Sequence, residues 1–528
     1  MTTQTRTKRE ATIDPLIFWP TVGIVVVVVA AMIIFESQAK VLIDQVFSFV
    51  TKQFGFVYQW AGVAALAAAL WLGFGRYSGV RLGGPDAKPE FRRLSWIAMF
   101  FCSGIGTSLI YWAAIEWTYY YTSPPLGLAA NSQAAAEYAA MYGMFHWGPI
   151  GWALYLLCAF PIGYAYYNRG KPSLRLSSGC EGVIGERHAN GLAGRIIDVM
   201  MIVGLIGGTG TSLAAGTPLL SEALSQYLGL ARSPTMDLVV VSIWTALFVT
   251  SVTLGLKRGI KVLSDMNIVA ILALCGLILV FGPTTFMLLT FTDSMGLMMS
   301  EFPRLALYTD SIGKSGFPQD WTVFYLAWWV AYGPYMGIFI ARISRGRTFR
   351  ELTTGVILGG SGGCALFFTL FGNWGMHSEL NGVFPLLETI KASGEAAGVI
   401  GLLKTLPFQW LVMPLFIFLA FVYSATTVDS SAYSIAIVAS KTSHTGEPSV
   451  GNRMFWAVSL GVIAIVLMKL GGLAPLKTAS LVVAVPLIFL MGMSFFSLKR
   501  WLLEDYQSIP LIKSDAAKLE GASAEAVA

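Results

Sequence analysis

Apolar residues in this chain occur in long runs rather than at the short intervals that mark amphipathic helices or strands. An α-helix needs roughly 20 consecutive, mostly apolar residues to cross the hydrocarbon core of a bilayer. The sequence supplies about twelve runs of this length, each closed by charged residues or by Gly and Pro. They span residues 16–35, 55–75, 94–120, 138–167, 196–229, 236–256, 266–291, 321–343, 352–373, 407–435, 454–471 and 473–498. The pattern predicts an all-α polytopic membrane protein.

Gly and Pro interrupt two of these runs. The third run contains Gly104-Ile105-Gly106, and the eighth contains Gly333-Pro334. Since non-helical backbone at membrane depth is tolerated only where it is buried in protein or lines a cavity, we expect broken helices there, close to a transport site. The small residues from Gly207 to Ser212 in the fifth run are explained equally well by tight helix packing.

The two interruptions lie five helices apart, which is the spacing that two inverted five-helix repeats require. The first two helices are then peripheral. The expected order along the chain is a cytoplasmic N-terminal tail (1–15), two peripheral helices and their loops (16–93), the first five-helix repeat (94–292), a periplasmic connection with an interfacial helix (293–320), the second five-helix repeat (321–498) and a short cytoplasmic tail (499–528).

Composition and charge agree with a membrane location. Hydrophobic residues make up 55% of the chain and charged residues 12%, against about 25% charged residues in soluble domains. Basic residues gather in alternate connections, and short basic loops remain cytoplasmic, so both termini are expected in the cytoplasm. These residues are Arg76, Arg81, Lys88, Arg92, Arg93, Arg169, Lys171, Arg175, Arg187, Lys257, Arg258, Lys261, Arg342, Arg345, Arg347 and Arg350. The net charge of +6 therefore reflects topology and contact with lipid head groups, not nucleic-acid binding.

The sequence offers no pattern typical of an enzyme. Its five cysteines and four histidines match no disulfide framework or metal-ligand spacing, and no loop resembles a phosphate-binding site. Paired acids and a nucleophile with its base are also missing. We therefore expect no cofactor and a solute carrier driven by an ion or solute gradient. A channel is the alternative that concentrative uptake would exclude.

Aromatic residues are dense in the run 321–343. Trp328 and Tyr332 share one helix face, and Tyr325 and Trp329 share the adjoining face. A quaternary ammonium cannot donate an N–H hydrogen bond, so aromatic faces bind it through cation–π attraction and apolar contact. We expect such a cage here in preference to an interfacial aromatic belt. Two further candidates, for which a belt is an equal alternative, are Trp147 and Tyr119.

Acidic residues inside a bilayer are costly and usually functional. Asp429 lies in a hydroxyl-rich stretch between Tyr423 and Ser431, where oxygen ligands suit Na⁺ and a carboxyl group suits proton exchange. Orientation of neighbouring helices through hydrogen bonds is the alternative role. Glu116 poses the same choice, and we interpret it as structural.

Three motifs resemble a known family. Trp328-Trp329 is followed by Ile338-Phe339-Ile340-Ala341-Arg342-Ile343-Ser344-Arg345-Gly346-Arg347, and the other two motifs are Phe145-His146-Trp147 and Gly471-Gly472-Leu473. In these motifs, and from about residue 15 to about residue 500, the chain resembles the betaine/carnitine/choline transporter family. The resemblance implies twelve helices, a five-plus-five inverted repeat after two leading helices, and a homotrimer in the bacterial inner membrane.

The same resemblance implies a binding site for trimethylammonium solutes. The positions that match the family's tryptophan box are Trp147, Trp328, Trp329 and Tyr332, with Tyr119 closing one side. The Trp-Trp-x-x-Tyr form is similar to that of the family's carnitine/γ-butyrobetaine antiporter. L-carnitine and γ-butyrobetaine are therefore the expected substrates, with glycine betaine and choline as alternatives.

For ion coupling, the resemblance implies two conflicting patterns. Met336 matches the methionine that occupies the place of one ion in the sodium-independent antiporter, whereas Asn267 stands where that antiporter has an arginine in place of a second sodium. An uncharged amide cannot replace a cation. Thr426 and Thr427 match the hydroxyl residues that bind sodium in the betaine symporter. The backbone carbonyls that complete this site are those near Cys102 and Ile105. Sodium symport is therefore expected, with exchange as the alternative.

Overall fold

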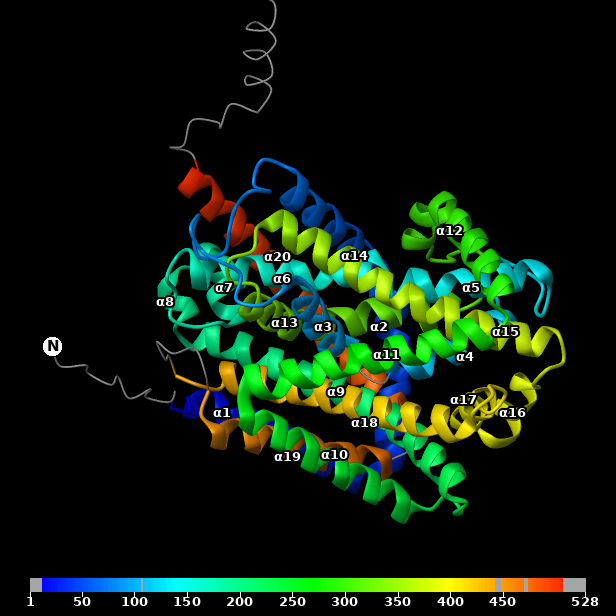
Figure 1. Ribbon diagram of the computed structural model, residues 1–528. Coiled ribbons are helices and arrows are strands. Elements are labelled where there is room, and N and C mark those ends of the chain that lie inside the picture. The colour runs from blue at the N-terminus through cyan, green and yellow to red at the C-terminus, as the bar shows by residue number, and fades with distance from the viewer. Residues whose placement is uncertain (1–11, 106–107, 442–447, 470–472, 507–528) are drawn as a thin grey trace, which may run out of the picture.

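The protein is built from long helices that lie side by side (Figure 1). The computed structural model describes residues 12–105, 108–441, 448–469 and 473–506. Within these ranges there is no β-sheet, and isolated bridges of extended backbone pair Ile13 with Ser440 and Arg81 with Thr348. The predicted all-α class is confirmed.

The helices follow one another along the chain. The first eleven are α1 (Pro15–Ile34), α2 (Glu36–Phe74), α3 (Arg93–Ile105), α4 (Ser108–Thr122), α5 (Gln133–His146), α6 (Pro149–Tyr167), α7 (Leu176–Ile184), α8 (Glu186–Ala189), α9 (Leu192–Leu228), α10 (Pro234–Gly255) and α11 (Lys261–Phe281). The others are α12 (Thr284–Leu307), α13 (Phe324–Ile343), α14 (Phe349–Phe367), α15 (Asn373–Leu380), α16 (Leu386–Ser393), α17 (Glu395–Leu403), α18 (Gln409–Val438), α19 (Val450–Lys469) and α20 (Leu473–Tyr506). Three π-helical turns are η1 (Leu256–Ile260), η2 (Pro318–Val323) and η3 (Phe368–Gly372).

Length and hydropathy support many membrane spans but do not confirm twelve. Among the described residues, nine helical segments are long and apolar enough to cross a bilayer, and α3 with α4 makes a tenth. Two other apolar helical stretches, Pro15–Ala31 and Val450–Val466, are shorter. The chain is thus a multi-pass membrane protein.

One of the two predicted helix breaks is present. The third run forms two helices, α3 and α4, whose axes differ by 61°. Gly106, which belongs to the predicted interruption, lies outside the described residues. The break predicted at Pro334 is wrong, because α13 continues through this residue to Ile343. Neighbouring helices can compensate in a membrane protein for the backbone hydrogen bond that a proline removes, so a proline alone does not end a helix there.

Some helix ends differ from those predicted. The seventh run was expected to reach residue 291, but α11 ends at Phe281 and a separate helix, α12, begins at Thr284. The Gly282-Pro283 pair between them explains the division, since proline lacks a backbone donor and suits the start of a new helix. At the C-terminal end, α20 continues to Tyr506 instead of closing near 498. Gly471 and Gly472 lie outside the described residues.

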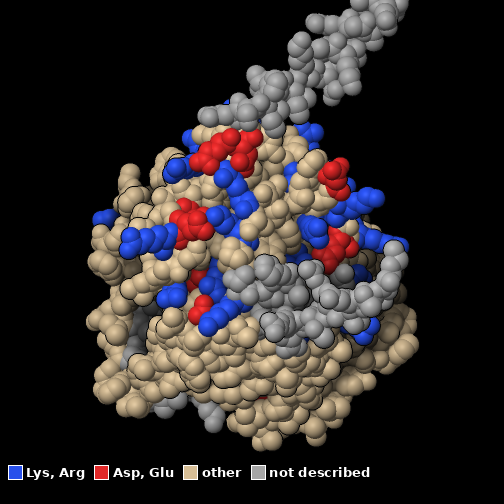
Figure 2. Space-filling model, turned by 90° about the vertical axis from the view of Figure 1, so that its left-hand side faces the viewer, with Lys and Arg blue, Asp and Glu red and all other residues tan. Residues whose placement is uncertain are grey.

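The basic connections meet at one end of the helices. Three ion pairs join them to each other and to both ends of the described chain: Arg342 with Glu90 (3.0 Å), Arg169 with Glu504 (2.7 Å) and Arg175 with Asp14 (3.2 Å). Figure 2 looks onto this end and shows Lys and Arg side chains spread across it, with acidic side chains among them. The connections that these three pairs join therefore lie on one side of the protein.

Helix α13 occupies the centre of the protein. Almost all of its residues are buried, and it packs most extensively against α6. In contrast, α1 and α2 expose many large apolar side chains, among them Trp19, Val27, Phe49 and Trp60.

Candidate functional site

Four predicted cage residues meet in the interior. The ring centroid of Trp328 lies 5.3 Å from that of Trp147, 5.5 Å from that of Trp329 and 5.1 Å from that of Tyr332. The rings of Trp147 and Trp329 are 6.0 Å apart. All four side chains are buried in the protein, Trp328 being the most exposed at 4%. Because rings buried in this way do not face the lipid interface, an interior cluster describes them better than an aromatic belt.

The local sequence fixes the position of Trp147. This residue caps the end of α5, where its backbone N–H donates to the Gly143 carbonyl at 3.1 Å. Gly148 then adopts an extended conformation, and Pro149 begins α6, where its missing N–H costs nothing. Trp147 therefore lies at the corner between two buried helices and points towards α13.

Two of the rings lie directly against glycines of other helices. A Cβ atom on Gly151 of α6 would lie 2.3 Å from Trp329 Cε2, and one on Gly208 of α9 would lie 2.3 Å from Tyr332 Cε2. Real side chains do not approach this closely, so only glycine fits at either position. At Gly208, the small residues of the fifth run therefore serve helix packing, and α9 is continuous there.

Tyr119 does not lie with the other predicted cage residues. Its hydroxyl donates to Glu395 Oε1 at 2.8 Å, and its ring packs against Trp321 at 5.2 Å and Trp112 at 6.2 Å. The neighbouring Tyr120, not Tyr119, points inward and is completely buried. Three consecutive tyrosines precede Thr122, and the sequence alone did not indicate which of them faces the interior.

Met336 lies one helical turn beyond Tyr332 and faces the end of α3. Its sulfur would be 3.6 Å from a Cβ atom placed on Gly104, and the Tyr155 ring borders the same position at 3.3 Å. Met336 therefore lies between the aromatic cluster and the last turn of α3.

The end of α3 carries four backbone carbonyls in the middle of the protein. The last carbonyls of a helix have no partner within it. Here each accepts a hydrogen bond from a hydroxyl group: Cys102 O from Thr427 (3.0 Å), Ser103 O from Tyr335 (2.9 Å), Gly104 O from Tyr155 (3.3 Å) and Ile105 O from Ser108 (2.6 Å). A helix C-terminus also carries a partial negative charge, which favours a cation.

Most predicted ion ligands gather beside this helix end. Thr427 bonds to Cys102, and the Asn267 amide nitrogen donates to Thr426 Oγ1 at 3.0 Å. The Ile105 carbonyl is the exception, because it bonds to Ser108 of α4 rather than to either threonine. Three buried oxygen atoms of α3 and α11 have no hydrogen-bond partner in the described part of the chain: Ser103 Oγ, Ser264 Oγ and Asn267 Oδ1. Oxygen ligands of this kind suit a small hard cation.

Asp429 lies one turn beyond Thr426 on α18 and is completely buried. Its Oδ2 accepts a hydrogen bond from the Ser251 hydroxyl, which lies near the end of α10. Its Oδ1 has no partner among the described residues, and Arg453 of α19 lies within electrostatic range. Asp429 thus joins three helices close to the predicted ion ligands, which is compatible with both of its predicted roles.

Glu116, which the sequence led us to interpret as structural, contacts one of the predicted cage residues. Its carboxylate is completely buried and accepts a hydrogen bond from the indole N–H of Trp147 at 3.0 Å. An acid at membrane depth requires a partner. The sequence identified the acid but could not indicate that its partner is Trp147, a predicted cage residue.

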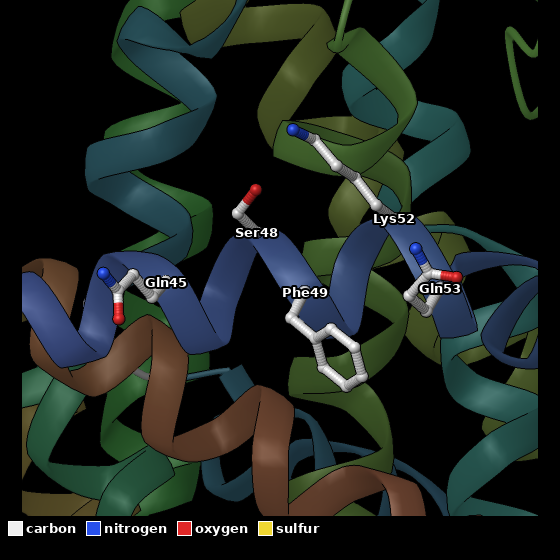
Figure 3. A pocket seen from close by; sticks show the side chains of 5 residues that line it. All are labelled: Gln45, Ser48, Phe49, Lys52 and Gln53. Carbon is white, nitrogen blue, oxygen red and sulfur yellow. The ribbon is translucent and has the colours of Figure 1, made fainter.

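Other features lie apart from this cluster. The five cysteines are buried and form no disulfide with one another. Across the described ranges, no group of three or more His, Cys, Asp or Glu side chains is placed to hold a metal. An open groove lies on the outer side of α2, where Gln45, Ser48, Phe49, Lys52 and Gln53 line it (Figure 3). None of these five residues belongs to the predicted site.

Comparison with known proteins gives two findings. The sequence profile of the betaine/carnitine/choline family transporters (BCCT) matches residues 16–507. Among solved structures, the substrate-bound outward-open state of a Na⁺-coupled sialic acid symporter is similar over 87% of this chain and 86% of that chain. The sequence identity is 13% and the TM-score is 0.43. This second likeness is too distant to transfer any property.

Proposed function

Because this chain belongs to the betaine/carnitine/choline transporter family, and is therefore a secondary transporter of betaine-like compounds and not an enzyme, we propose that it carries L-carnitine or γ-butyrobetaine together with Na⁺ by alternating access. The observation that carries the substrate proposal is the interior cluster of Trp147, Trp328, Trp329 and Tyr332. Their faces and edges meet at 5.1 to 6.0 Å between centroids.

A trimethylammonium group suits this cluster for two reasons. It cannot donate an N–H hydrogen bond, so it does not require a polar acceptor, and its positive charge is attracted to the faces of indole and phenol rings. Such attraction is stronger where water is excluded, and these rings are buried. The rest of the substrate is not assigned to particular residues.

The proposed Na⁺ site lies at the end of α3, with Na⁺ as a second cargo. The Cys102 carbonyl and the hydroxyls of Thr426 and Thr427 are the first ligands in this proposal, and Asn267 Oδ1 is a further oxygen on the same cluster. The negative end of the α3 dipole adds to the attraction for a cation. The Ile105 carbonyl joins them only if its bond to Ser108 opens.

Sodium-independent exchange is the second candidate, and two observations favour it. Met336 lies against Gly104 at the end of α3, next to the proposed ion ligands. The Asn267 amide nitrogen donates a hydrogen bond to the Thr426 hydroxyl oxygen. This bond occupies a lone pair of that oxygen which Na⁺ would otherwise use. The unpartnered Asn267 Oδ1 favours symport in return.

Uptake into proteoliposomes distinguishes these candidates. We expect an inward Na⁺ gradient to drive accumulation of radiolabelled L-carnitine into vesicles without internal substrate. Replacement of external Na⁺ by K⁺ should reduce the initial rate at least about tenfold, since each tenfold step corresponds to only about 1.4 kcal/mol of coupling. Uptake that occurs only with internal γ-butyrobetaine and ignores Na⁺ would establish exchange instead.

We also propose the membrane arrangement that the charge pattern and the family imply. The charged end in Figure 2 faces the cytoplasm of a bacterium, both termini lie on that side, and residues 94–292 and 321–498 approximate the two inverted repeats, adjusted for the end of α11 at Phe281. Three copies form a trimer. Light scattering of the purified protein should then give about three times the 57.1-kDa chain mass.

Gly208→Ala should weaken substrate binding although it adds only one methyl group. The new Cβ would collide with Tyr332, and overpacking of this kind costs about 1–3 kcal/mol. If most of this cost appears as displacement of the ring, the dissociation constant of L-carnitine rises by about fivefold or more. Equilibrium binding to the purified protein measures it.

Gly276→Ala is the matched control, because a Cβ atom at Gly276 of α11 meets nothing within 4 Å. It should leave the dissociation constant unchanged. Equal affinities of both variants and the parent protein would show that Tyr332 does not contribute to the binding site.

A further inference from the structure

A buried polar network lies directly behind Trp147. Its centre is the Glu116 carboxylate, which accepts hydrogen bonds from three donors on three elements. Tyr120 donates to Oε1 at 2.5 Å, Trp147 donates to Oε2 at 3.0 Å, and Tyr325 of α13 also donates to Oε2. All of these side chains are buried. An ionised carboxylate accepts all three bonds, whereas a protonated acid would present a hydrogen of its own among these donors.

His146 extends the network. Its Nδ1 lies 2.9 Å from the Tyr120 hydroxyl and its Nε2 lies 3.0 Å from Thr322 Oγ1. One arrangement with an uncharged imidazole satisfies every contact: Nδ1–H donates to Tyr120, Tyr120 donates to Glu116, and Thr322 donates to Nε2. The 3.9 Å between Nδ1 and Glu116 Oε1 is too long for a direct hydrogen bond. The network then carries one net negative charge.

Only one indole ring separates this charge from the aromatic cluster. The same Trp147 that donates to Glu116 contacts Trp328 at 5.3 Å and Trp329 at 6.0 Å. Hydrogen bonds in a chain polarise one another, so a donor bound to a carboxylate gains electron density. A more electron-rich ring attracts a cation more strongly. The carboxylate also attracts a bound cation directly through a medium from which water is excluded.

We infer that Glu116 is a specificity-determining residue of the cage: its negative charge, placed behind Trp147, makes the site select a cationic head group over an uncharged group of the same shape. This inference rests on the proposed function and deepens it. It also replaces the purely structural role that the sequence suggested for Glu116.

A structural role and a selective role make different predictions. If Glu116 only holds Trp147 and Tyr325 in place, its loss lowers the affinity for every ligand of the right shape by the same factor. If its charge selects the head group, its loss lowers the affinity for cationic ligands alone. A pair of ligands that differ only in that charge separates the two roles.

Such a pair is γ-butyrobetaine and 5,5-dimethylhexanoate, in which a quaternary carbon replaces the quaternary nitrogen. Each compound is tested as a competitor of radiolabelled L-carnitine on the purified full-length protein. In Glu116→Gln, we expect the ratio of the inhibition constant of 5,5-dimethylhexanoate to that of γ-butyrobetaine to fall by about tenfold. This is the order expected for a unit charge across one ring at an effective dielectric constant near 20. The constant for 5,5-dimethylhexanoate should change by less than about threefold.

Two further comparisons complete the test. Tyr120→Phe removes one donor to Glu116 but keeps the charge, so it should leave the ratio unchanged. If Glu116→Gln does not yield monodisperse protein, Trp147→Phe takes its place, because it breaks the indole link to the carboxylate. Its matched control is Trp328→Phe, which makes the same replacement within the cage at a ring that is not one of the three donors to Glu116. The ratio should fall more in Trp147→Phe than in Trp328→Phe.

Each outcome decides between the proposals. Equal loss of both ligands in Glu116→Gln, or an unchanged ratio, overturns the role of Glu116 in selection and leaves the proposed function intact. An equal fall of the ratio in Trp147→Phe and Trp328→Phe also overturns the role of Glu116 in selection and leaves the proposed function intact. Failure of the parent protein to bind γ-butyrobetaine or L-carnitine overturns the proposed function, and the inference about Glu116 with it.

Discussion

Trp328→Ala is expected to weaken binding of γ-butyrobetaine by roughly 100-fold. The Trp328 ring contacts Trp147, Trp329 and Tyr332, so its loss removes the one side chain that touches all three other rings. A desolvated cation–π contact contributes about 2 kcal/mol or more, and lost apolar contact adds to it. Competition against radiolabelled L-carnitine in purified protein measures the effect.

Trp244→Ala provides a control for the cavity that the first variant leaves. Trp244 is a fully buried tryptophan of α10, packed against Phe421 of α18. Its removal should lower thermal stability about as much as removal of Trp328 but leave the dissociation constant within about twofold. Similar losses of affinity in both variants would mean that the effect of Trp328 is general destabilisation, and the cage would be refuted.

Replacement of Thr426 and Thr427 together by Ala should abolish stimulation of uptake by Na⁺. Both hydroxyls lie beside the end of α3, where Thr427 contacts the Cys102 carbonyl and Thr426 contacts Asn267. Na⁺ is coordinated by only a few oxygen ligands, and the double variant removes two of those proposed here. The remaining carbonyls should then be too few to replace the water that surrounds the ion in solution. Initial rates of L-carnitine uptake in Na⁺ and K⁺ media of equal ionic strength give the ratio.

Thr217→Ala is the control for the loss of buried threonine hydroxyls in the double variant. Thr217 is fully buried on α9, and its hydroxyl donates to the Leu213 carbonyl of its own helix at 2.8 Å. Its loss should leave Na⁺ stimulation intact. If the double variant kept full stimulation, the ion site would have to lie elsewhere, and Asp429 with its unpartnered oxygen would be the next residue to test.

The sequence predicts the helices well because their main determinant is local. A run of apolar residues either is long enough to cross a bilayer or is not. Helix ends depend on less obvious features: Gly282-Pro283 divides a continuous apolar run, whereas Pro334 lies within a continuous helix. The difference is set by the packing around each proline, which no local pattern contains.

The site was predictable only in part for a similar reason. Trp328 and Tyr332 share a face by helical periodicity, and their neighbours Trp147 and Trp329 fit the family motif. The partner of an acid, in contrast, is a long-range property. Neither the inward direction of Tyr120 rather than Tyr119 nor the bond from Trp147 to Glu116 follows from spacing, because each depends on how α4 packs against α5 and α13.

The glycine contacts of the cage limit how the helices can move during transport. Trp329 and Tyr332 of α13 each lie on a glycine of another helix, Gly151 of α6 and Gly208 of α9. Sliding of α6 or α9 along α13 by about 1.5 Å, the rise of one residue, would move these glycines away from the rings that now pack on them. Shear is therefore obstructed at the very level where substrate is proposed to bind. Rigid-body rotation, in which α13 moves together with the helices that bear these glycines, avoids that collision.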